Sequence, residues 1–185
     1  MSNALLVMDV QVNVMSRYAG AARLLEPVTR ALAAARLNHV PVIFVRVAFR
    51  PGYPEVSAAN RTMSTIRQTA GDTFTAGNPA TELHPSLDAR PDEPVVVKKR
   101  YSAFTGSDLE VLLRSRGITR LVLAGISTSG VVLSTLREAA DRDYQLVLLK
   151  DACWDADDEV HRVLTEKIFP RQADVVTVAQ WVESL

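Results

Sequence analysis

Four stretches of the chain are nearly continuous runs of apolar residues, many of them β-branched, and two shorter runs resemble them. Parallel strands that are covered on both faces give continuous apolar runs rather than an alternation of apolar and polar positions. The pattern therefore predicts six β-strands, at residues 4–10, 40–47, 94–99, 120–126, 144–152 and 173–178.

The segments between these runs have helical spacing. In residues 21–38 an apolar face recurs at the spacing of an amphipathic helix, formed by Leu24, Leu25, Val28, Leu32 and Ala35. Further helices are predicted at residues 108–116, 131–142 and 157–168. Strands that alternate with helices indicate βαβ units. The predicted fold class is therefore α/β, a three-layer α/β/α sandwich of the Rossmann type around a six-stranded, mostly parallel sheet.

Residues 49–94 are the least regular part of the chain and are rich in proline. A connection of this length in a compact domain usually carries a lid, a binding loop or an oligomer contact. We expect one of these roles for it.

Length and charge narrow the functional classes. A chain of 185 residues has the length of one domain, so residues 1–185 are predicted to form a single domain. The 21 Lys and Arg residues balance the 21 Asp and Glu residues, so we expect neither a nucleic-acid nor a membrane partner. No apolar run approaches the roughly 20 residues that span a bilayer. A single cysteine and the lack of a basic leader indicate a reducing, cytoplasmic location.

Three polar features follow predicted strands: Asp9, Lys98 and the turn Ser127-Thr128-Ser129-Gly130. In open parallel sheets, ligands bind at the carboxyl ends of the strands. An Asp at the end of a buried strand is costly to ionise, so Asp9 is either a general acid/base that a lysine tunes or half of a structural ion pair. Lys98 is its candidate partner, although Lys98 with its basic neighbours could equally be a solvated run.

These features lie in three longer motifs, ALLVMDVQ, VVVKKRYSAFTGSDLEVLLRSRGITRLVLAGISTSG and YQLVLLKDAC. In these motifs, and in their order along nearly the whole chain, the sequence resembles the isochorismatase-like hydrolases, also called cysteine hydrolases. The resemblance implies the same α/β fold and a small-molecule substrate.

Carried over position by position, the resemblance places the family's catalytic Asp at Asp9, its catalytic Lys at Lys98 and its cysteine nucleophile at Val131. It also implies a cis peptide bond between Ile126 and Ser127, with backbone amides near Val131 facing the pocket. Six residues are expected to contact substrate: Gln11, Tyr101, Phe104, Ile126, Ser127 and Thr128.

Val131 cannot attack an amide carbonyl, so thiol amidase chemistry through this position is excluded. Cys153 is the only thiol, but it follows a different strand, and a structural or incidental role is expected for it. The hydroxyls of Ser127, Thr128 and Ser129 lie near the pocket, but turn-forming roles fit them better than nucleophilic ones.

Isochorismatase itself resembles this chain in keeping the Asp and Lys without the cysteine, and it hydrolyses a vinyl ether. The resemblance implies that Asp9 donates a proton to an enol-ether carbon while Lys98 is its electrostatic partner, so no covalent intermediate is needed. Candidate residues for binding substrate carboxylates are Arg46, Arg50 and Arg100. The alternative is a catalytically silent member that binds a small molecule or serves as a scaffold.

Neither a metal nor another cofactor is expected. Some members bind a divalent ion through an Asp and histidines, whereas His39, His84 and His161 are scattered along this sequence. Aromatic residues near the strand ends provide candidates for an apolar pocket: Phe49, Tyr53, Tyr101, Phe104 and Trp154. The resemblance also implies a homo-oligomer, a dimer or a tetramer, with residues 49–94 as the candidate contact.

Overall fold

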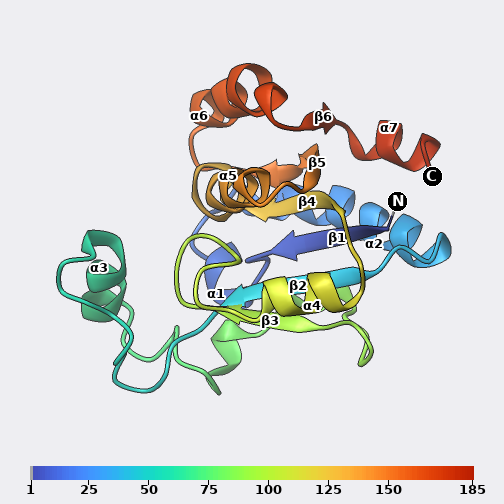
Figure 1. Cartoon of the computed structure of the whole chain (residues 1–185). Coiled ribbons are helices and arrows are strands. Elements are labelled where there is room, and N and C mark those ends of the chain that lie inside the picture. The colour runs from blue at the N-terminus through green and yellow to red at the C-terminus, as the bar shows by residue number, and fades with distance from the viewer. Residues whose placement is uncertain (1) are drawn as a thin grey trace.

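The computed structural model describes residues 2–185 and has a six-stranded sheet at its centre (Figure 1). Its strands are β1 (Asn3–Met8), β2 (Val42–Val47), β3 (Val95–Lys98), β4 (Arg120–Ile126), β5 (Gln145–Trp154) and β6 (Asp174–Val176). Their order in the sheet is β3-β2-β1-β4-β5-β6, and every neighbouring pair is parallel. All six predicted strands are thus confirmed, and the sheet is parallel throughout.

Helices cover both faces of the sheet and complete the three layers. They are α1 (Val12–Met15), α2 (Leu25–Leu37), α3 (Arg61–Thr69), α4 (Leu109–Ser115), α5 (Leu133–Asp141), α6 (Asp158–Val163) and α7 (Val178–Glu183). Figure 1 shows α4 and α5 on one face and α2 on the other. The predicted α/β/α sandwich is confirmed.

The alternation of side chains along β1 explains how one strand serves both layers. Leu6 and Met8 pack with α4 and α5, whereas Leu5 and Val7 pack with α2 and α7. All four residues are fully buried, and burying a side chain of this size stabilises the fold by roughly 1.5–3 kcal/mol. Because both faces of β1 are covered, its sequence is continuously apolar.

The four predicted helices are present, but they begin or end at residues other than those predicted. The first begins as a 3₁₀ turn at Ala21–Leu24, and the fourth continues beyond α6 as a π turn at Leu164–Ile168. The third begins at Leu133, after a kinked turn that spans Thr128–Val132.

Three helices were not predicted, of which α3 matters most for function. Among its nine residues only Met63 and Ile66 are large and apolar, too few to show a helical stripe. Asn60 nevertheless starts the helix, because its side chain accepts a hydrogen bond from the backbone N–H of Met63. Figure 1 shows α3 standing beside the sheet, on the side to which the arrowheads of β1 and β2 point.

Between residues 2 and 185, no helix is long and apolar enough to cross a membrane.

Strands β1 and β4 pair Met8 with Gly125 at the end of their shared register. Gly125 has φ +148°, and a Cβ added there would lie 2.3 Å from the carbonyl oxygen of Met8. Only glycine meets both conditions without displacing the neighbouring strand. The backbone path at the end of β4, which leads into the candidate site, therefore depends on glycine at position 125.

We predict that Gly125→Ala lowers the free energy of unfolding by about 3 kcal/mol or more, because it adds a backbone clash to a strained φ angle. Gly117→Ala is the matched control, since Gly117 also has a positive φ but has nothing within 4 Å of its added Cβ. That variant should lose only about 1–2 kcal/mol. Urea unfolding measures both changes, and equal losses would show that the contact with Met8 is unimportant.

Candidate active site

The strand order reverses between β1 and β4, and a cavity of about 420 Å³ opens at this point of the sheet. Open α/β sheets bind ligands at such a reversal, beyond the carboxyl ends of the strands. The strands and the segments that follow them contribute eight lining residues: Asp9, Val47, Lys98, Tyr101, Ile126, Ser127, Gly130 and Val131. The three positions predicted for catalysis, Asp9, Lys98 and Val131, therefore line one cavity.

Asp9 and Lys98 form a buried ion pair in this cavity. The Nζ atom of Lys98 lies 2.8 Å from Oδ2 of Asp9, and it also donates to the carbonyl oxygen of Arg100 at 3.0 Å. The side chains of Lys98 and Asp9 are only 3% and 10% exposed. Asp9 leaves β1 with φ 56°, while its backbone N–H donates to Val45 of β2. The strand end thereby fixes where the carboxyl group lies.

Burial raises the pKa of Asp9 above its ordinary value, and this effect exceeds the opposing effect of Lys98. The Oδ1 atom of Asp9 is buried and has no hydrogen-bond partner among residues 2–185. An unpaired oxygen on a carboxyl group with a raised pKa is suited to carry a proton. The arrangement can therefore supply a general acid.

Residues 127–132, called here the cavity turn, contribute Ser127, Gly130 and Val131 to the wall of the same cavity. The peptide bond between Ile126 and Ser127 is cis. Gly130 has a non-helical backbone, and a Cβ there would lie 2.6 Å from Oγ of Ser127. Val131, a residue that is 2% exposed, lines the cavity with an apolar side chain. The turn brings residue 131 into the site without a nucleophilic atom.

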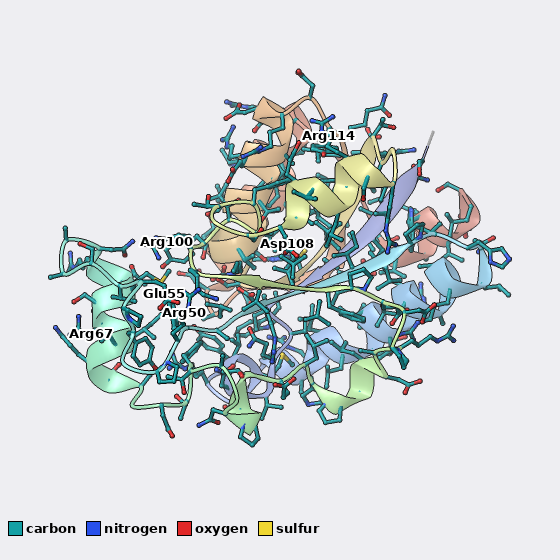
Figure 2. All side chains as sticks on the ribbon, turned by 60° about the horizontal axis from the view of Figure 1, so that its bottom comes forward. Arg50, Glu55, Arg67, Arg100, Asp108 and Arg114 are labelled. Carbon is teal, nitrogen blue, oxygen red and sulfur yellow. The ribbon has the colours of Figure 1, made fainter. Side chains whose placement is uncertain are left out.

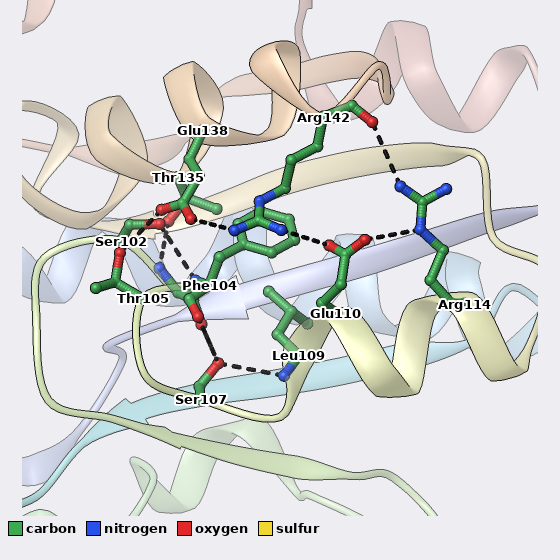
Figure 3. A network of polar contacts seen from close by, with 11 residues as sticks. Ser102, Phe104, Thr105, Ser107, Leu109, Glu110, Arg114, Thr135, Glu138 and Arg142 are labelled. Carbon is green, nitrogen blue, oxygen red and sulfur yellow. Dashed lines mark hydrogen bonds and ion pairs between the residues drawn. The ribbon is translucent and has the colours of Figure 1, made fainter.

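Hydrogen bonds from α5 hold the segment between β3 and α4, which carries Tyr101 (Figure 3). Oγ1 of Thr135 accepts from the backbone N–H of Ala103 at 2.9 Å, and Thr105 donates to Glu138 at 3.0 Å. Arg142 bonds Glu138 at 2.6 Å and pairs with Glu110 of α4 at 3.4 Å. The hydrogen bonds thus join α5 to the segment that follows Lys98, and Arg142, which follows α5, joins that helix to α4.

Three of the residues expected to contact substrate do not line the cavity. Phe104 is a core residue, and Figure 3 shows its ring beneath Arg142, whose guanidinium carbon lies 4.9 Å from the ring centroid. Gln11 is fully buried and bonds the backbone of Val47 and Thr81 through both of its side-chain groups. Thr128 is fully buried and bonds His161. Each of these three side chains is packed or hydrogen-bonded inside the fold.

The arginines proposed to bind carboxylates are also engaged elsewhere. Arg46 pairs with Glu82 at 2.6 Å. Figure 2 shows Arg50, Glu55 and Arg100 together: Arg50 pairs with Glu55 at 2.8 Å, and Arg100 donates to the carbonyl oxygen of Glu55 at 2.9 Å. None of the three arginines lines the cavity.

Two other arginines, Arg17 and Arg61, line the cavity. Neither lies within ion-pair distance of a carboxylate among residues 2–185, and Arg17 lies over the ring of Phe74 at 4.6 Å. The sequence gives little indication of them, because Arg17 follows a short helix and Arg61 begins one that was not predicted. Two positive charges without a carboxylate partner make this wall of the cavity cationic.

Helix α3 supplies six of the residues that line the cavity. Its lining residues are Arg61, Thr62, Met63, Thr65, Ile66 and Thr69. The lining also includes Val14, Tyr18 and Phe74. Residues 49–94 were expected to carry a lid, a binding loop or an oligomer contact, and α3 within this stretch lines the cavity.

The remaining aromatic residues and the cysteine have other surroundings. Phe49 and Tyr53 form a small core with Met63 and Phe74 beneath α3, and Trp154 packs against Tyr18 at 5.3 Å. Cys153 is buried, and burial raises the pKa of its thiol to about 12. A thiol with this pKa has almost no thiolate near neutral pH, so it is a poor nucleophile.

Of the three histidines, His84 caps the 3₁₀ turn Pro85–Leu87. His39 has a positive φ at the end of the α2 connection. His161 is half-buried, with Nδ1 2.8 Å from Oγ1 of Thr128. Within residues 2–185, no three His, Cys, Asp or Glu side chains gather in a way that could hold a metal ion.

Curated relatives resemble the chain over most of its length. The isochorismatase family protein YecD of Escherichia coli O157:H7 is 35% identical over 194 residues, which cover 100% of this chain and 96% of that protein. The ureidoacrylate amidohydrolase RutB of Pseudomonas syringae pv. syringae is 34% identical over 171 residues. This match covers 85% of this chain and 66% of the relative.

Solved structures share the fold. An isochorismatase family protein from Burkholderia thailandensis superposes with a TM-score of 0.86 at 29% identity, covering 100% of this chain and 95% of that one. A cysteine hydrolase from Pseudomonas syringae pv. phaseolicola gives a TM-score of 0.89 at 24% identity, with coverage of 98% and 91%. The family model of the isochorismatase domain matches residues 3–180. The chain therefore belongs to the isochorismatase family.

Proposed function

We propose that the protein hydrolyses a small, acid-labile anion, an enol ether of the isochorismate type, by general acid catalysis without a covalent intermediate. Asp9 is the acid and Lys98 is its electrostatic partner. The observation that carries this proposal is the buried carboxyl group of Asp9, which lines the cavity and has a raised pKa and an unpaired Oδ1 atom. The nucleophile position of the same cavity holds Val131.

The reaction proceeds in two stages. Asp9 transfers its proton to the terminal carbon of the enol ether, which turns the adjacent carbon into an oxocarbenium ion. Water then adds to that carbon and returns a proton to Asp9, and the resulting hemiketal separates into a ketone and an alcohol. Lys98, 2.8 Å from Oδ2, stabilises the carboxylate that exists between these two proton transfers. No step requires an atom from residue 131.

The cationic wall supports an anionic substrate. Arg17 and Arg61 line the cavity and are exposed, whereas the side chain of Lys98 is only 3% exposed beside Asp9, so the two arginines are the charges most accessible to a ligand. Guanidinium groups bind carboxylates through paired hydrogen bonds. The apolar lining residues Met63, Ile66 and Phe74 suit the carbon skeleton of such a molecule.

Hydrolysis of an amide is less well supported, although RutB is named for that reaction. Val131 has no group that could form an acyl intermediate, and Cys153 is buried with a raised pKa outside the cavity lining. A family member that binds ligand without turnover is the competing outcome, and the following experiment distinguishes the two.

We predict that the purified protein hydrolyses isochorismate but not nicotinamide or simple amides, and that Asp9→Asn lowers kcat at least about 100-fold because it removes the proton donor. Asparagine keeps the shape of the side chain and can still accept a hydrogen bond from Lys98. Product formation is followed by liquid chromatography, and circular dichroism confirms that the variant folds.

Asp92→Asn, a change of the same chemistry at an exposed position, is the control and should keep full activity. Binding of isochorismate without turnover would establish the silent alternative. Amide turnover that disappears in Cys153→Ala would instead assign the reaction to that thiol.

We predict that kcat/KM is constant at low pH and falls about tenfold per pH unit above the pKa of Asp9, because the protonated carboxyl group is the reactive form. Since burial raises that pKa, the inflection should lie above 3.8, the ordinary value for Asp. A pH profile of isochorismate hydrolysis in buffers of constant ionic strength measures it. A rate that rises with pH over the same range would assign Asp9 a base role instead.

We predict that Arg17→Gln and Arg61→Gln each raise KM for isochorismate about tenfold or more and change kcat less, because each removes a charged hydrogen-bond donor from the substrate carboxylates. Arg67→Gln is the matched control, since Arg67 also belongs to α3 but does not line the cavity (Figure 2). Initial-rate kinetics provide both constants. An unchanged KM in both variants would show that the cationic wall does not bind substrate.

A further inference from the structure

Two side chains outside the cavity bond consecutive residues of the cavity turn. Nδ1 of His161 lies 2.8 Å from Oγ1 of Thr128, and Oδ2 of Asp155 accepts the backbone N–H of Ser129 at 2.7 Å. Neither Asp155 nor His161 lines the cavity. Asp155 lies in the short connection between β5 and α6, and His161 lies in α6 itself, so neighbouring parts of the chain bond the turn.

The burial of these groups makes both hydrogen bonds costly to lose. Thr128 is fully buried and Asp155 is 7% exposed, so water cannot readily replace either partner. Thr128 and Ser129 lie between Ser127 and Gly130, two residues that line the cavity. A shift of the bonded residues therefore moves the cavity wall.

These parts of the chain are themselves fixed. Oδ1 of Asp155 accepts the N–H of Asp157 at 3.4 Å, and Asp157 caps α6 by accepting the N–H groups of Glu159 and Val160. Burial lowers the pKa of His161, so its ring is neutral near pH 7 and can share a single hydrogen bond with the hydroxyl of Thr128. The residues that bond the cavity turn are therefore held in place by hydrogen bonds at the start of α6.

We propose that His161 and Asp155 are positioning residues that hold the cavity turn at its working distance from Asp9 and Lys98. This inference rests on the proposed function for its kinetic consequence, but the restraint itself is a property of the fold. A displacement of about 1 Å at a reacting centre can cost on the order of 100-fold in rate, so a restraint outside the cavity can control turnover.

The kinetic test uses His161→Leu, Thr128→Val and their combination, with isochorismate as the probe. Each single variant should lower kcat at least about tenfold and leave KM within about twofold, because the bound substrate keeps its contacts but meets a displaced wall. The double variant should lose no more than either single variant, because both remove the same bond. His161→Asn, which offers a polar atom near the position of Nδ1, should recover most of kcat.

A second measurement does not depend on turnover. Amide hydrogen exchange of the folded protein should become at least about tenfold faster in residues 127–132 in His161→Leu and in Asp155→Ala, and should stay unchanged in β1 and β2. Glu166→Gln, in the π turn that continues α6, is the matched control and should change neither exchange nor kcat.

These measurements separate this inference from the proposed function. If the wild-type protein does not hydrolyse isochorismate, the proposed function fails, and the exchange rates alone decide whether the restraint exists. Unchanged exchange in the cavity turn of both variants would overturn the inference. A change in KM with kcat intact, or losses that add in the double variant, would also overturn the positioning role.

Discussion

A carboxylate and an ammonium group that leave water each lose several kcal/mol of hydration, and only close contact between them offsets this cost. Asp9 and Lys98 meet this condition at 2.8 Å, although the strands that carry them are not neighbours. Strand β2 lies between them and pairs Val45 with Met8 and Val47 with Lys98. The ion pair therefore depends on the register of three strands, and the chemistry of the site depends on the sheet.

The parts of this site that could be predicted are those that strand ends determine. Asp9, Lys98 and the turn at residues 127–130 follow apolar runs typical of buried parallel strands, so the fold class predicted that they meet at one edge of the sheet. The assignment of Val131 to the nucleophile position came from the family resemblance. Phe104 was expected at the cavity because it follows Tyr101 closely in the sequence, but its ring lies in the core beneath Arg142 and does not line the cavity. Arg17 and Arg61 were missed because the helices beside them bury too few apolar residues to show a periodic pattern. The partnership of His161 with Thr128 joins residues 33 positions apart, and no local pattern encodes such a distance.

The end of β4 and the cavity turn have strict steric demands although the nucleophile position holds Val131. An added Cβ would lie 2.3 Å from a backbone oxygen at Gly125 and 2.6 Å from a hydroxyl oxygen at Gly130. These contacts concern the path of the backbone and are independent of the side chain at residue 131. The geometry of the turn thus serves the shape of the cavity and the placement of its wall, which a reaction without a covalent intermediate also needs.

Helix α3 contributes six lining residues to the cavity but lies outside the sheet. It makes no ion pair or hydrogen bond with the side chain of Asp9 or Lys98. The acid and its partner lie at the ends of β1 and β3. Six of the residues that line the cavity lie instead in one polar helix within a long connection. Substitutions in that helix can change which molecule is accepted and leave the proton donor untouched. Ligand preference and reaction chemistry can therefore diverge separately during the evolution of this chain.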